Sequence, residues 1–386
     1  MLCHHGGTMV LRTDTATHRA ETLIDLGAIS HNVQLLAARA TEHGAATMVV
    51  VKADGYGHGA VPVAKAALRG GATWLGTAAI DEALQLREAG ITAPILTWLY
   101  VPGEDFAGAI AADIDLAVSS IDGLRLVEAA ARQAGKPARV HLKVDTGLTR
   151  NGAQPADWAD LVKHALASDE VRPLAIWSHL ASADEPGHEN IDLQATRFDE
   201  AYRACKEFGW NPLRHLANSA ATLTRPDLYF DIVRPGVAAY GLNPIPGLDD
   251  GGLIPAMSFR SVVALVKRVP AGEGVSYGHS WTTPRDTTLA LVPVGYADGI
   301  PRSLSGRFQV VLGGRPRDVV GRVCMDQIVV DLGDDTASIG DEVLVFGPGT
   351  QGEQTAQDWA DRLGTIHYEI VCGMGRSRVR RTYVDG

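Results

Sequence analysis

Apolar residues in the first two thirds of the chain fall into eight short runs, at residues 46–51, 73–78, 94–98, 114–119, 139–144, 173–178, 214–217 and 230–234. The segments between them have a helical period. Two such segments place apolar side chains on one helix face: Ile29, Val33, Leu36 and Ala40 in the first, and Leu124, Val127, Ala131 and Ala134 in the second. Eight alternations of strand and helix predict a parallel (β/α)8 barrel over residues 21–242, with an open doubly wound sheet as the structural alternative.

The pattern changes after Gly241. Residues 243–256 concentrate proline and glycine, which predicts a linker. Short apolar strands separated by glycine, proline and aspartate follow at 261–269, 287–294, 308–314, 327–333 and 341–347. They predict a mainly β domain over residues 257–386. One helix is expected at 355–364, with Thr355 as its N-cap and Gly364 as its stop signal.

Composition narrows the class of partner. The chain has 386 residues, of which 46% are hydrophobic and 21% charged, as in soluble globular proteins. Its 45 acidic and 35 basic residues give a net charge of −10, which argues against nucleic acid or an anionic membrane as a partner. The four cysteines are too scattered for a zinc knuckle and too few for a disulfide scaffold, and they indicate free thiols in a reducing cytosol.

The first twenty residues lack a continuous apolar segment, so neither secretion nor membrane insertion is indicated. We expect residues 1–20 to be disordered or extended and the protein to be cytoplasmic.

The most informative segment is MVVVKADGYGHG, residues 48–59, in which a buried strand leads directly to Lys52. A partly desolvated lysine at a strand's carboxyl end loses preference for its ammonium form, which favours Schiff-base chemistry. The glycines that follow allow the backbone to approach a bound group closely. The alternative is a solvated lysine beside an ordinary turn.

Other polar residues follow later predicted strands at the same end of the barrel: Lys143, His179, Asn218, Ser219 and Arg234. Barrel enzymes collect their chemistry at this face. Ser219 opens a predicted helix, and the loop after Arg234 can direct the amides of Gly236 and Val237 at an anion. These residues predict a phosphate site.

The segment around Lys52 resembles the cofactor-lysine motif of alanine racemases, which are pyridoxal-phosphate enzymes. Eight further blocks resemble that family in the same order: KVDTGLTR (143–150), WSHLA (177–181), HLANSAATLTRPD (215–227), FDIVRPGVAAYG (230–241), GEGVSYGH (272–279), VGYADGIPR (294–302), GRVCMDQ (321–327) and GTIHYE (364–369). The resemblance implies a fold type III enzyme that interconverts L-alanine and D-alanine with pyridoxal 5′-phosphate and supplies D-alanine for peptidoglycan.

The resemblance also implies roles for individual residues. Lys52 would hold the cofactor and act as a base on one face of the substrate carbon, and Tyr277 would be the opposing base. A tyrosine needs cationic neighbours to act as a base, and the family supplies these through His179 and Arg234. Arg234 would contact the pyridine nitrogen, where many pyridoxal enzymes place a carboxylate.

Further contacts follow from the same resemblance. The cofactor-binding residues would be Lys52, Tyr56, His179, Asn218, Ser219, Arg234, Gly236, Val237 and Tyr368. The substrate-binding residues would be Arg150, Met325 and Tyr296. Lys143 resembles a lysine that is carbamylated in many members, and no metal is implied. The family's usual methionine and glycine before Arg150 are replaced here by Leu148 and Thr149, which changes the loop.

In the family, Tyr277 reaches the barrel of the other subunit, so we expect a homodimer with shared active sites. A serine-preferring or broader racemase would share the lysine and the phosphate pocket. A decarboxylase would bring segments for a second substrate charge, and no such motif is found. A non-catalytic pyridoxal-phosphate binding protein would keep Lys52 but would not need Tyr277.

Overall fold

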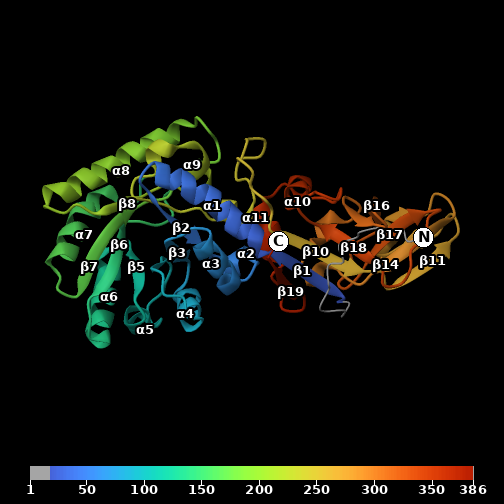
Figure 1. Cartoon of the computed structure of the whole chain (residues 1–386), viewed down its shortest axis with the longest axis horizontal. Coiled ribbons are helices and arrows are strands. Elements are labelled where there is room, and N and C mark those ends of the chain that lie inside the picture. Colours follow the sequence, from blue (N-terminus) through green and yellow to red (C-terminus); the bar gives the residue numbers. More distant parts are fainter. Residues whose placement is uncertain (1–17, 386) are drawn as a thin grey trace, which may run out of the picture.

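The structure is a computed structural model that describes residues 18–385. It has two parts (Figure 1): a compact body of strands and helices, and an elongated, mainly β part that extends from it. The expectation of a disordered or extended segment at residues 1–20 falls mostly outside the described residues. Among the residues described, no helix is long and apolar enough to cross a membrane.

The first part is a barrel of eight parallel strands in the order β8-β7-β6-β5-β4-β3-β2-β9. Their bounds are β2 (Ala46–Val50), β3 (Trp74–Thr77), β4 (Ile95–Thr97), β5 (Ile114–Val118), β6 (Ala138–Lys143), β7 (Val171–Trp177), β8 (Leu213–His215) and β9 (Ile232–Val233). The end strands approach each other, because Asp231 N donates to Arg214 O at 3.0 Å and Arg234 N to Ala217 O at 2.9 Å. The predicted barrel is therefore confirmed and nearly closed.

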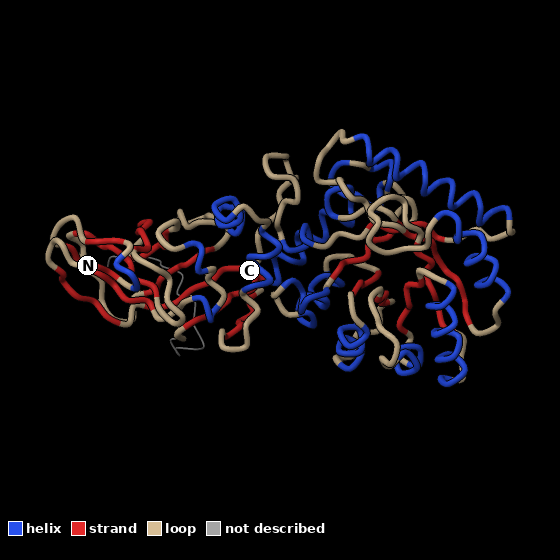
Figure 2. Tube along the Cα trace, turned by 180° about the vertical axis from the view of Figure 1, so that it is seen from behind, coloured by secondary structure: helices blue, strands red, loops and turns tan. Residues whose placement is uncertain are grey.

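Helices cover the outside of this barrel (Figure 2). They are α1 (Leu26–Glu42), α3 (Ala60–Arg69), α4 (Ile80–Glu88), α5 (Phe106–Ala111), α6 (Ile121–Ala134), α7 (Pro155–Ala167), α8 (Glu189–Glu207) and α9 (Ser219–Thr224), with a short turn, α2 (Lys52–Tyr56), after β2. The apolar face predicted for the first helix is fully buried in α1. In α6 the predicted face is buried except at Ala134, which is partly exposed at the helix end.

The second part is built on a nine-stranded sheet in the order β11-β14-β17-β16-β15-β18-β10-β1-β19. Its strands are β1 (Ala20–Asp25), β10 (Met257–Val262), β11 (Leu265–Val269), β14 (Thr287–Val292), β15 (Gln309–Leu312), β16 (Arg315–Val320), β17 (Ile328–Gly333), β18 (Glu342–Phe346) and β19 (Arg380–Val384). A hairpin of β12 (Gly274–Val275) and β13 (Trp281–Thr282) accompanies this sheet. Single turns of 3-10 helix form in both parts of the chain, at Pro226–Leu228, Val237–Tyr240, Tyr277–His279, Tyr296–Asp298 and Arg302–Leu304.

The strand β1 joins the beginning of the chain to this second sheet. It pairs antiparallel with β10 and parallel with β19, and in Figure 1 it lies among strands from the far end of the sequence. The sequence analysis begins the barrel part at residue 21, so these residues fall on the other side of the expected boundary. Their alternation of buried and partly exposed side chains is short and gives no sign of a distant partner.

Two further features position the mouth of the barrel. Residues 243–256 form neither helix nor strand, as the proline and glycine content predicts. The helix α10 (Ala356–Leu363) begins after Thr355, whose side chain accepts a hydrogen bond from Asp358 N, and ends at Gly364 in a left-handed conformation. The next helix, α11 (His367–Gly373), contacts α2.

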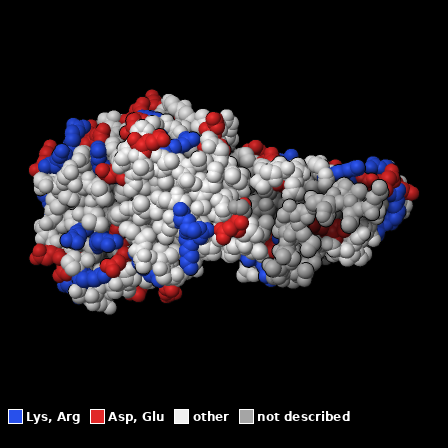
Figure 3. Space-filling view, in the orientation of Figure 1, with Lys and Arg blue, Asp and Glu red and all other residues white. Residues whose placement is uncertain are grey.

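Charged side chains of both signs are interspersed around uncharged surface on the face drawn in Figure 3.

Candidate active site

A cavity of about 670 Å³ opens at the carboxyl ends of the barrel strands, with walls completed by the 243–256 segment and by α10 and α11. It brings together all of the site residues that the sequence predicts in the barrel and on α11: Lys52, Tyr56, Lys143, Arg150, His179, Asn218, Ser219, Arg234, Gly236, Val237 and Tyr368. Among the described residues, no three His, Cys, Asp or Glu side chains are grouped to hold a metal ion.

Lys52 stands at the beginning of an unusual turn. The residues after it, Ala53, Asp54, Gly55 and Tyr56, all have positive φ, at 53°, 51°, 61° and 50°. For residues other than glycine this conformation costs roughly 1–2 kcal/mol each. Such strain persists only where the surroundings fix it, and it is typical of functional sites.

Two carboxylates fix this turn. Glu82 at the start of α4 accepts hydrogen bonds from Ala53 N at 2.6 Å and from Ala78 N at 2.8 Å, so it ties the turn to the end of β3. Asp54 accepts from Ala60 N at 2.8 Å and pairs with Arg381 at 2.8 Å. The direction in which Lys52 leaves the backbone is therefore set from both sides.

Two amines in the cavity have a weakened preference for charge. Burial lowers the pKa of Lys52, and the positive charge of Arg150 adds to the effect. Lys143 is 5% exposed. Its Nζ lies 4.4 Å from the centre of the Trp177 ring. Burial, followed by the charges of Arg234 and Arg150, lowers the pKa of Lys143 to about 8. A neutral amine is the form that reacts with a carbonyl group or with carbon dioxide.

Arg234 is a buried cation at the floor of the cavity. Its Nη2 donates to Ser178 O at 2.7 Å and to Leu216 O at 3.2 Å, and its Nη1 lies 3.2 Å from His215 Nδ1. No carboxylate pairs with it among residues 18–385. Burial lowers the pKa of Arg234 to about 9, so the guanidinium stays charged at pH 7. A buried cation without an anion favours a ligand that supplies an acceptor.

His179 lies 3.4 Å from Arg234 Nη2 through its Nδ1. Burial lowers the pKa of His179 well below its ordinary value, and the charges of Arg234 and Arg150 lower it further. The imidazole is therefore neutral at pH 7. Of these two residues, Arg234 is therefore the one that carries a positive charge.

The anion-binding side of the cavity is formed by two helix starts. Asn218 caps α9 by accepting from Ala221 N at 3.1 Å. Ser219 Oγ accepts from Gly236 N at 2.8 Å, so the amide of Gly236 is already used. The amide of Val237 begins a 3-10 turn and has no partner within it. A side chain at Gly236 would overlap the hydroxyl of Tyr56, so only glycine fits there.

Arg150 is an exposed side chain on a loop that Asp145 organises. Asp145 Oδ1 accepts from Gly147 N at 2.9 Å and from Thr149 N at 3.1 Å. Thr149 has a φ of 59°, so it adopts the conformation that a glycine would hold without strain. The loop therefore accommodates Leu148 and Thr149 in place of the family's usual residues, and its backbone is held by Asp145.

Sequence reasoning missed several residues that complete the site. Of these residues, only Asp145 could have been predicted from the sequence, because an aspartate before Thr-Gly is typical of a side chain that closes a turn. Trp177 contacts Lys143 and stacks on His215 with ring centres 5.6 Å apart. Neither the role of Trp177 nor that of Glu82 is visible in spacing, because their partners come from other strands.

Three predicted site residues do not line this cavity within one chain: Tyr277, Tyr296 and Met325. All three lie on the β part, where Tyr277 is 69% and Met325 52% exposed. They lie near one another, since Tyr296 N donates to Cys324 O at 3.0 Å and Ser276 Oγ donates to Arg322 O at 2.7 Å. Tyr277 and Met325 are therefore exposed on this part of the chain, and Tyr296 is partly buried beside them.

The cavity suits a ligand with several negative charges. Four cations line it, namely Lys52, Lys143, Arg150 and Arg234, against the single carboxylate of Asp184. Its volume falls within the range typical of small-molecule sites. A phosphate-bearing aromatic ring and a carboxylate substrate together match this balance of charge.

Comparison with known proteins gives matches over nearly the whole chain. A family model described as the alanine racemase N-terminal domain matches residues 24–244, and one described as the alanine racemase C-terminal domain matches residues 256–383. The alanine racemase of Frankia casuarinae is 56% identical over 373 residues, which cover 95% of this chain and 96% of the relative. That of Mycobacterium avium is 54% identical over 370 residues, covering 94% and 95%.

The fold has the same neighbours. The crystal structure of an alanine racemase from D-cycloserine-producing Streptomyces lavendulae matches with a TM-score of 0.92 at 52% identity, covering 97% of this chain and 98% of that chain. The alanine racemase of Streptomyces coelicolor A3(2) matches with a TM-score of 0.91 at 52% identity, covering 95% and 98%.

Proposed function

This chain belongs to the alanine racemase family and interconverts L-alanine and D-alanine, and we propose that it does so with pyridoxal 5′-phosphate bound in the cavity at the barrel mouth. The observation that carries the proposal is this cavity, where two amines with lowered pKa and two guanidinium groups converge. The product D-alanine would serve peptidoglycan synthesis in the cytoplasm.

The residues of the cavity fit the cofactor. Lys52 would hold it covalently, and Arg234 would face its ring nitrogen. Ser219, the amide of Val237 and the hydroxyl of Tyr56 would bind its phosphate, with Tyr368 and Asn218 at the border. The amide of Gly236 already donates to Ser219, so the contribution of Gly236 would be the space left by its missing side chain. The bound cofactor supplies an electron-accepting ring that stabilises the charge left on the substrate carbon after proton removal.

Racemisation needs a proton removed from one face of the carbon and returned to the other, so it needs two groups. Lys52 would be one, since burial lowers its pKa and so weakens its preference for the charged form. Tyr277 would be the other. It does not line the cavity of its own chain and is exposed on the β part, and these two observations support its assignment to the site of a second copy.

The substrate side of the site follows the same logic. Arg150 would bind the carboxylate of alanine through its planar fork of donors. Tyr296 and Met325 would enter from the partner with Tyr277 and narrow the pocket. Carbamylation of Lys143 would replace one cation with an anion beside Arg150, and the pKa of about 8 supports it, because the neutral amine is the reactive form.

The test is incubation of the purified chain, loaded with pyridoxal phosphate, with L-alanine in deuterated buffer. We expect D-alanine that carries deuterium at the α carbon, because the proton delivered to the second face comes from a group that exchanges with solvent. Formation of D-alanine without deuterium would exclude exchange at either base. No D-alanine at all would refute the function.

Alanine and serine are assayed side by side under the same conditions. One added hydroxyl in a small pocket is discriminated only moderately, by roughly 1–3 kcal/mol. We expect alanine to have the higher kcat/KM. A higher value for serine would assign the chain to the serine-preferring alternative while leaving the cofactor and the two bases in place.

A further inference from the structure

A row of buried polar side chains runs from Arg234 into the interior of the barrel. Arg234 Nη1 lies 3.2 Å from His215 Nδ1, and His215 Nε2 lies 3.0 Å from His141 Nδ1. His141 Nε2 then lies 3.3 Å from Asp115 Oδ2. His141, His215 and Asp115 are fully buried, and they come from β6, β8 and β5. The row therefore links the floor of the cavity to the opposite half of the barrel.

Arg234, at the start of this row, sets the direction of each hydrogen bond that follows. A guanidinium has donors only, so His215 Nδ1 must accept from Arg234. A neutral imidazole that accepts at one nitrogen carries its proton on the other, so His215 Nε2 donates to His141 Nδ1. The same argument places the proton of His141 on Nε2, toward Asp115. Burial keeps His215 neutral, because it lowers the pKa of this residue well below the ordinary value.

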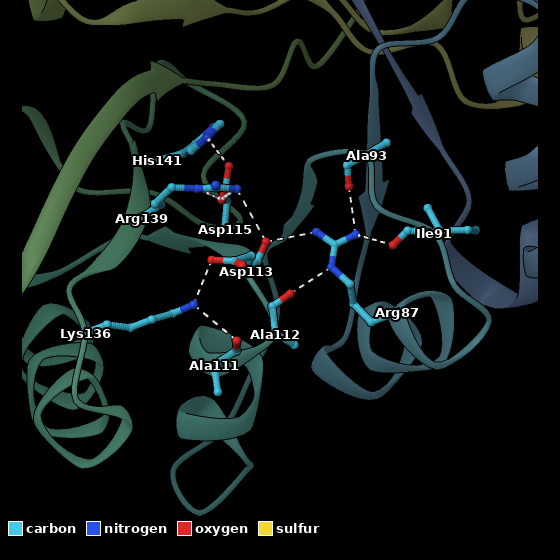
Figure 4. A network of polar contacts seen from close by, with 10 residues as sticks. All are labelled: Arg87, Ile91, Ala93, Ala111, Ala112, Asp113, Asp115, Lys136, Arg139 and His141. Atoms are coloured by element: carbon cyan, nitrogen blue, oxygen red, sulfur yellow. Dashed lines mark hydrogen bonds and ion pairs between the residues drawn. The ribbon is translucent and has the colours of Figure 1, made fainter.

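Asp115 closes the row with two different oxygens (Figure 4). Its Oδ1 accepts from Arg139, whose side chain is partly exposed at the barrel rim. Its Oδ2 has no hydrogen-bond partner with good geometry among the described residues, and neither has Nε2 of His141. The two unsatisfied atoms lie within reach of each other, so a small rotation of the imidazole satisfies both.

We propose that Asp115 and His141 are positioning residues for Arg234, acting through His215. The carboxylate favours the same tautomers from the other end of the row, so that an acceptor faces Nη1 of the buried guanidinium. Two imidazoles lie between this carboxylate and the cation, which has no carboxylate partner of its own among residues 18–385. The inference deepens the proposed function, on which it rests, because Arg234 is the residue assigned to the ring nitrogen of the cofactor.

Substitution Asp115→Asn tests the direction of the row. Arg139 offers only donors, so the amide oxygen must face Arg139 and the amide nitrogen must face His141. Two donors then oppose each other, unless His141 moves its proton to Nδ1. That change forces His215 to carry its proton on Nδ1, against Arg234. The variant is therefore isosteric but deprives the guanidinium of its acceptor.

The first readout is the 15N spectrum of histidine-labelled full-length protein, recorded with and without pyridoxal phosphate. We expect Nδ1 of His215 to change from unprotonated in the parent protein to protonated in Asp115→Asn. The second readout is racemisation of alanine by the loaded enzyme, for which we expect a loss of about tenfold in kcat, the low end for removal of a group that orients a functional residue.

The matched control is Asp113→Asn. Asp113 lies two residues away in the same polar network, but its carboxylate pairs with Lys136 at 2.7 Å on the surface and does not reach His141 (Figure 4). We expect the parent spectrum and the parent turnover. If the parent protein itself does not racemise alanine, the proposed function fails, whereas the 15N spectrum of Asp115→Asn still decides the present inference.

A second pair of variants covers the case in which Asp115→Asn does not fold. In His141→Asn the side-chain oxygen can accept from His215 Nε2, and in His141→Leu nothing can. We expect His141→Asn to keep the parent tautomer of His215 and more turnover than His141→Leu. Equal losses in this pair, a parent spectrum in Asp115→Asn, or lost turnover without a tautomer change would each overturn the inference.

Discussion

At the scale of single residues, His58 couples the cofactor loop to pH. It is fully buried, and its Nδ1 donates to Tyr56 O at 2.9 Å and to Gly55 O at 3.1 Å. Burial lowers the pKa of His58 to about 4. In the unfolded chain an imidazole titrates near 6.5. Because the unfolded state binds the proton more readily, His58 contributes stability that is present above pH 6.5 and is lost as the pH falls toward 4, about 3 kcal/mol in all.

Substitution His58→Asn should flatten this dependence, because the amide keeps a donor near the position of Nδ1 and does not titrate. We expect a smaller loss of unfolding free energy between pH 7 and pH 4.5 than in the parent protein, measured by urea unfolding. The control is His188→Asn, in which an exposed histidine that caps α8 is replaced by another capping residue. The same pH dependence in parent and His58→Asn would refute the assignment.

Asp145 acts on substrate binding through the loop that carries Arg150. Substitution Asp145→Ala removes the acceptor of two loop amides and releases the strained conformation of Thr149. Since Arg150 is assigned to the substrate carboxylate, we expect KM for alanine to rise several-fold, and by a larger factor than kcat falls. Steady-state kinetics measures both, with the exposed Asp169→Ala on the far side of the barrel as the control. A fall in kcat at unchanged KM would contradict this role.

At the scale of elements, one of the two carboxylates that hold the left-handed turn α2 comes from the start of α4. Substitution Glu82→Ala removes the acceptor of Ala53 N and Ala78 N. We expect weaker binding of pyridoxal phosphate, on the order of tenfold, and a loss of about 1 kcal/mol of stability, because the partly buried amide of Ala78 loses its partner. Cofactor absorption titrations and urea unfolding measure the two effects.

The control for this variant is Glu88→Ala, an exposed glutamate at the other end of α4. It should leave cofactor binding unchanged. Normal cofactor affinity in Glu82→Ala would show that the turn keeps its shape without this carboxylate.

Elements were predictable where one face of each is buried by near neighbours. The barrel strands and the face of α1 follow from apolar spacing, and α10 follows from its cap at Thr355 and its stop at Gly364. The strand β16 was missed because Arg315 and Arg317 hide its alternation behind charge. The strands β1 and β19 pair with each other across almost the whole sequence, and no local pattern contains that information.

The site was predictable to the same extent. Lys52, Arg234 and Ser219 follow strand ends within four residues, so topology alone places them together. Asp115 and His141 contact each other from neighbouring strands. The sequence does not show which face of its strand each of these residues lies on. The left-handed conformation of Ala53 and Asp54 was also hidden, because neither residue is a glycine.

At the scale of the whole molecule, our assignment of Tyr277, Tyr296 and Met325 to the site of a second copy predicts that a single chain holds only part of each site. We predict that two inactive variants restore each other. When Lys52→Ala and Tyr277→Phe chains are unfolded, mixed in equal amounts and refolded, half of the dimers contain both. One site of each mixed dimer then has an intact lysine and an intact tyrosine, so about a quarter of the parent activity should return.

The control is a mixture of Lys52→Ala with the double variant Lys52→Ala, Tyr277→Phe, in which no site has the lysine. Racemisation of alanine by each mixture is compared with that of each variant alone. Failure of the first mixture to exceed its components, while it forms mixed dimers, would place Tyr277 outside the shared site.

The position of β1 between β10 and β19 sets a limit on how this protein is made. The first strand of the described residues has its neighbours at residues 257–262 and 380–384, so it stays without these hydrogen-bonding partners while the barrel is synthesised. Both neighbours are in place only after residue 384 has been added. Until then the unpaired edges of β1 can pair with other chains.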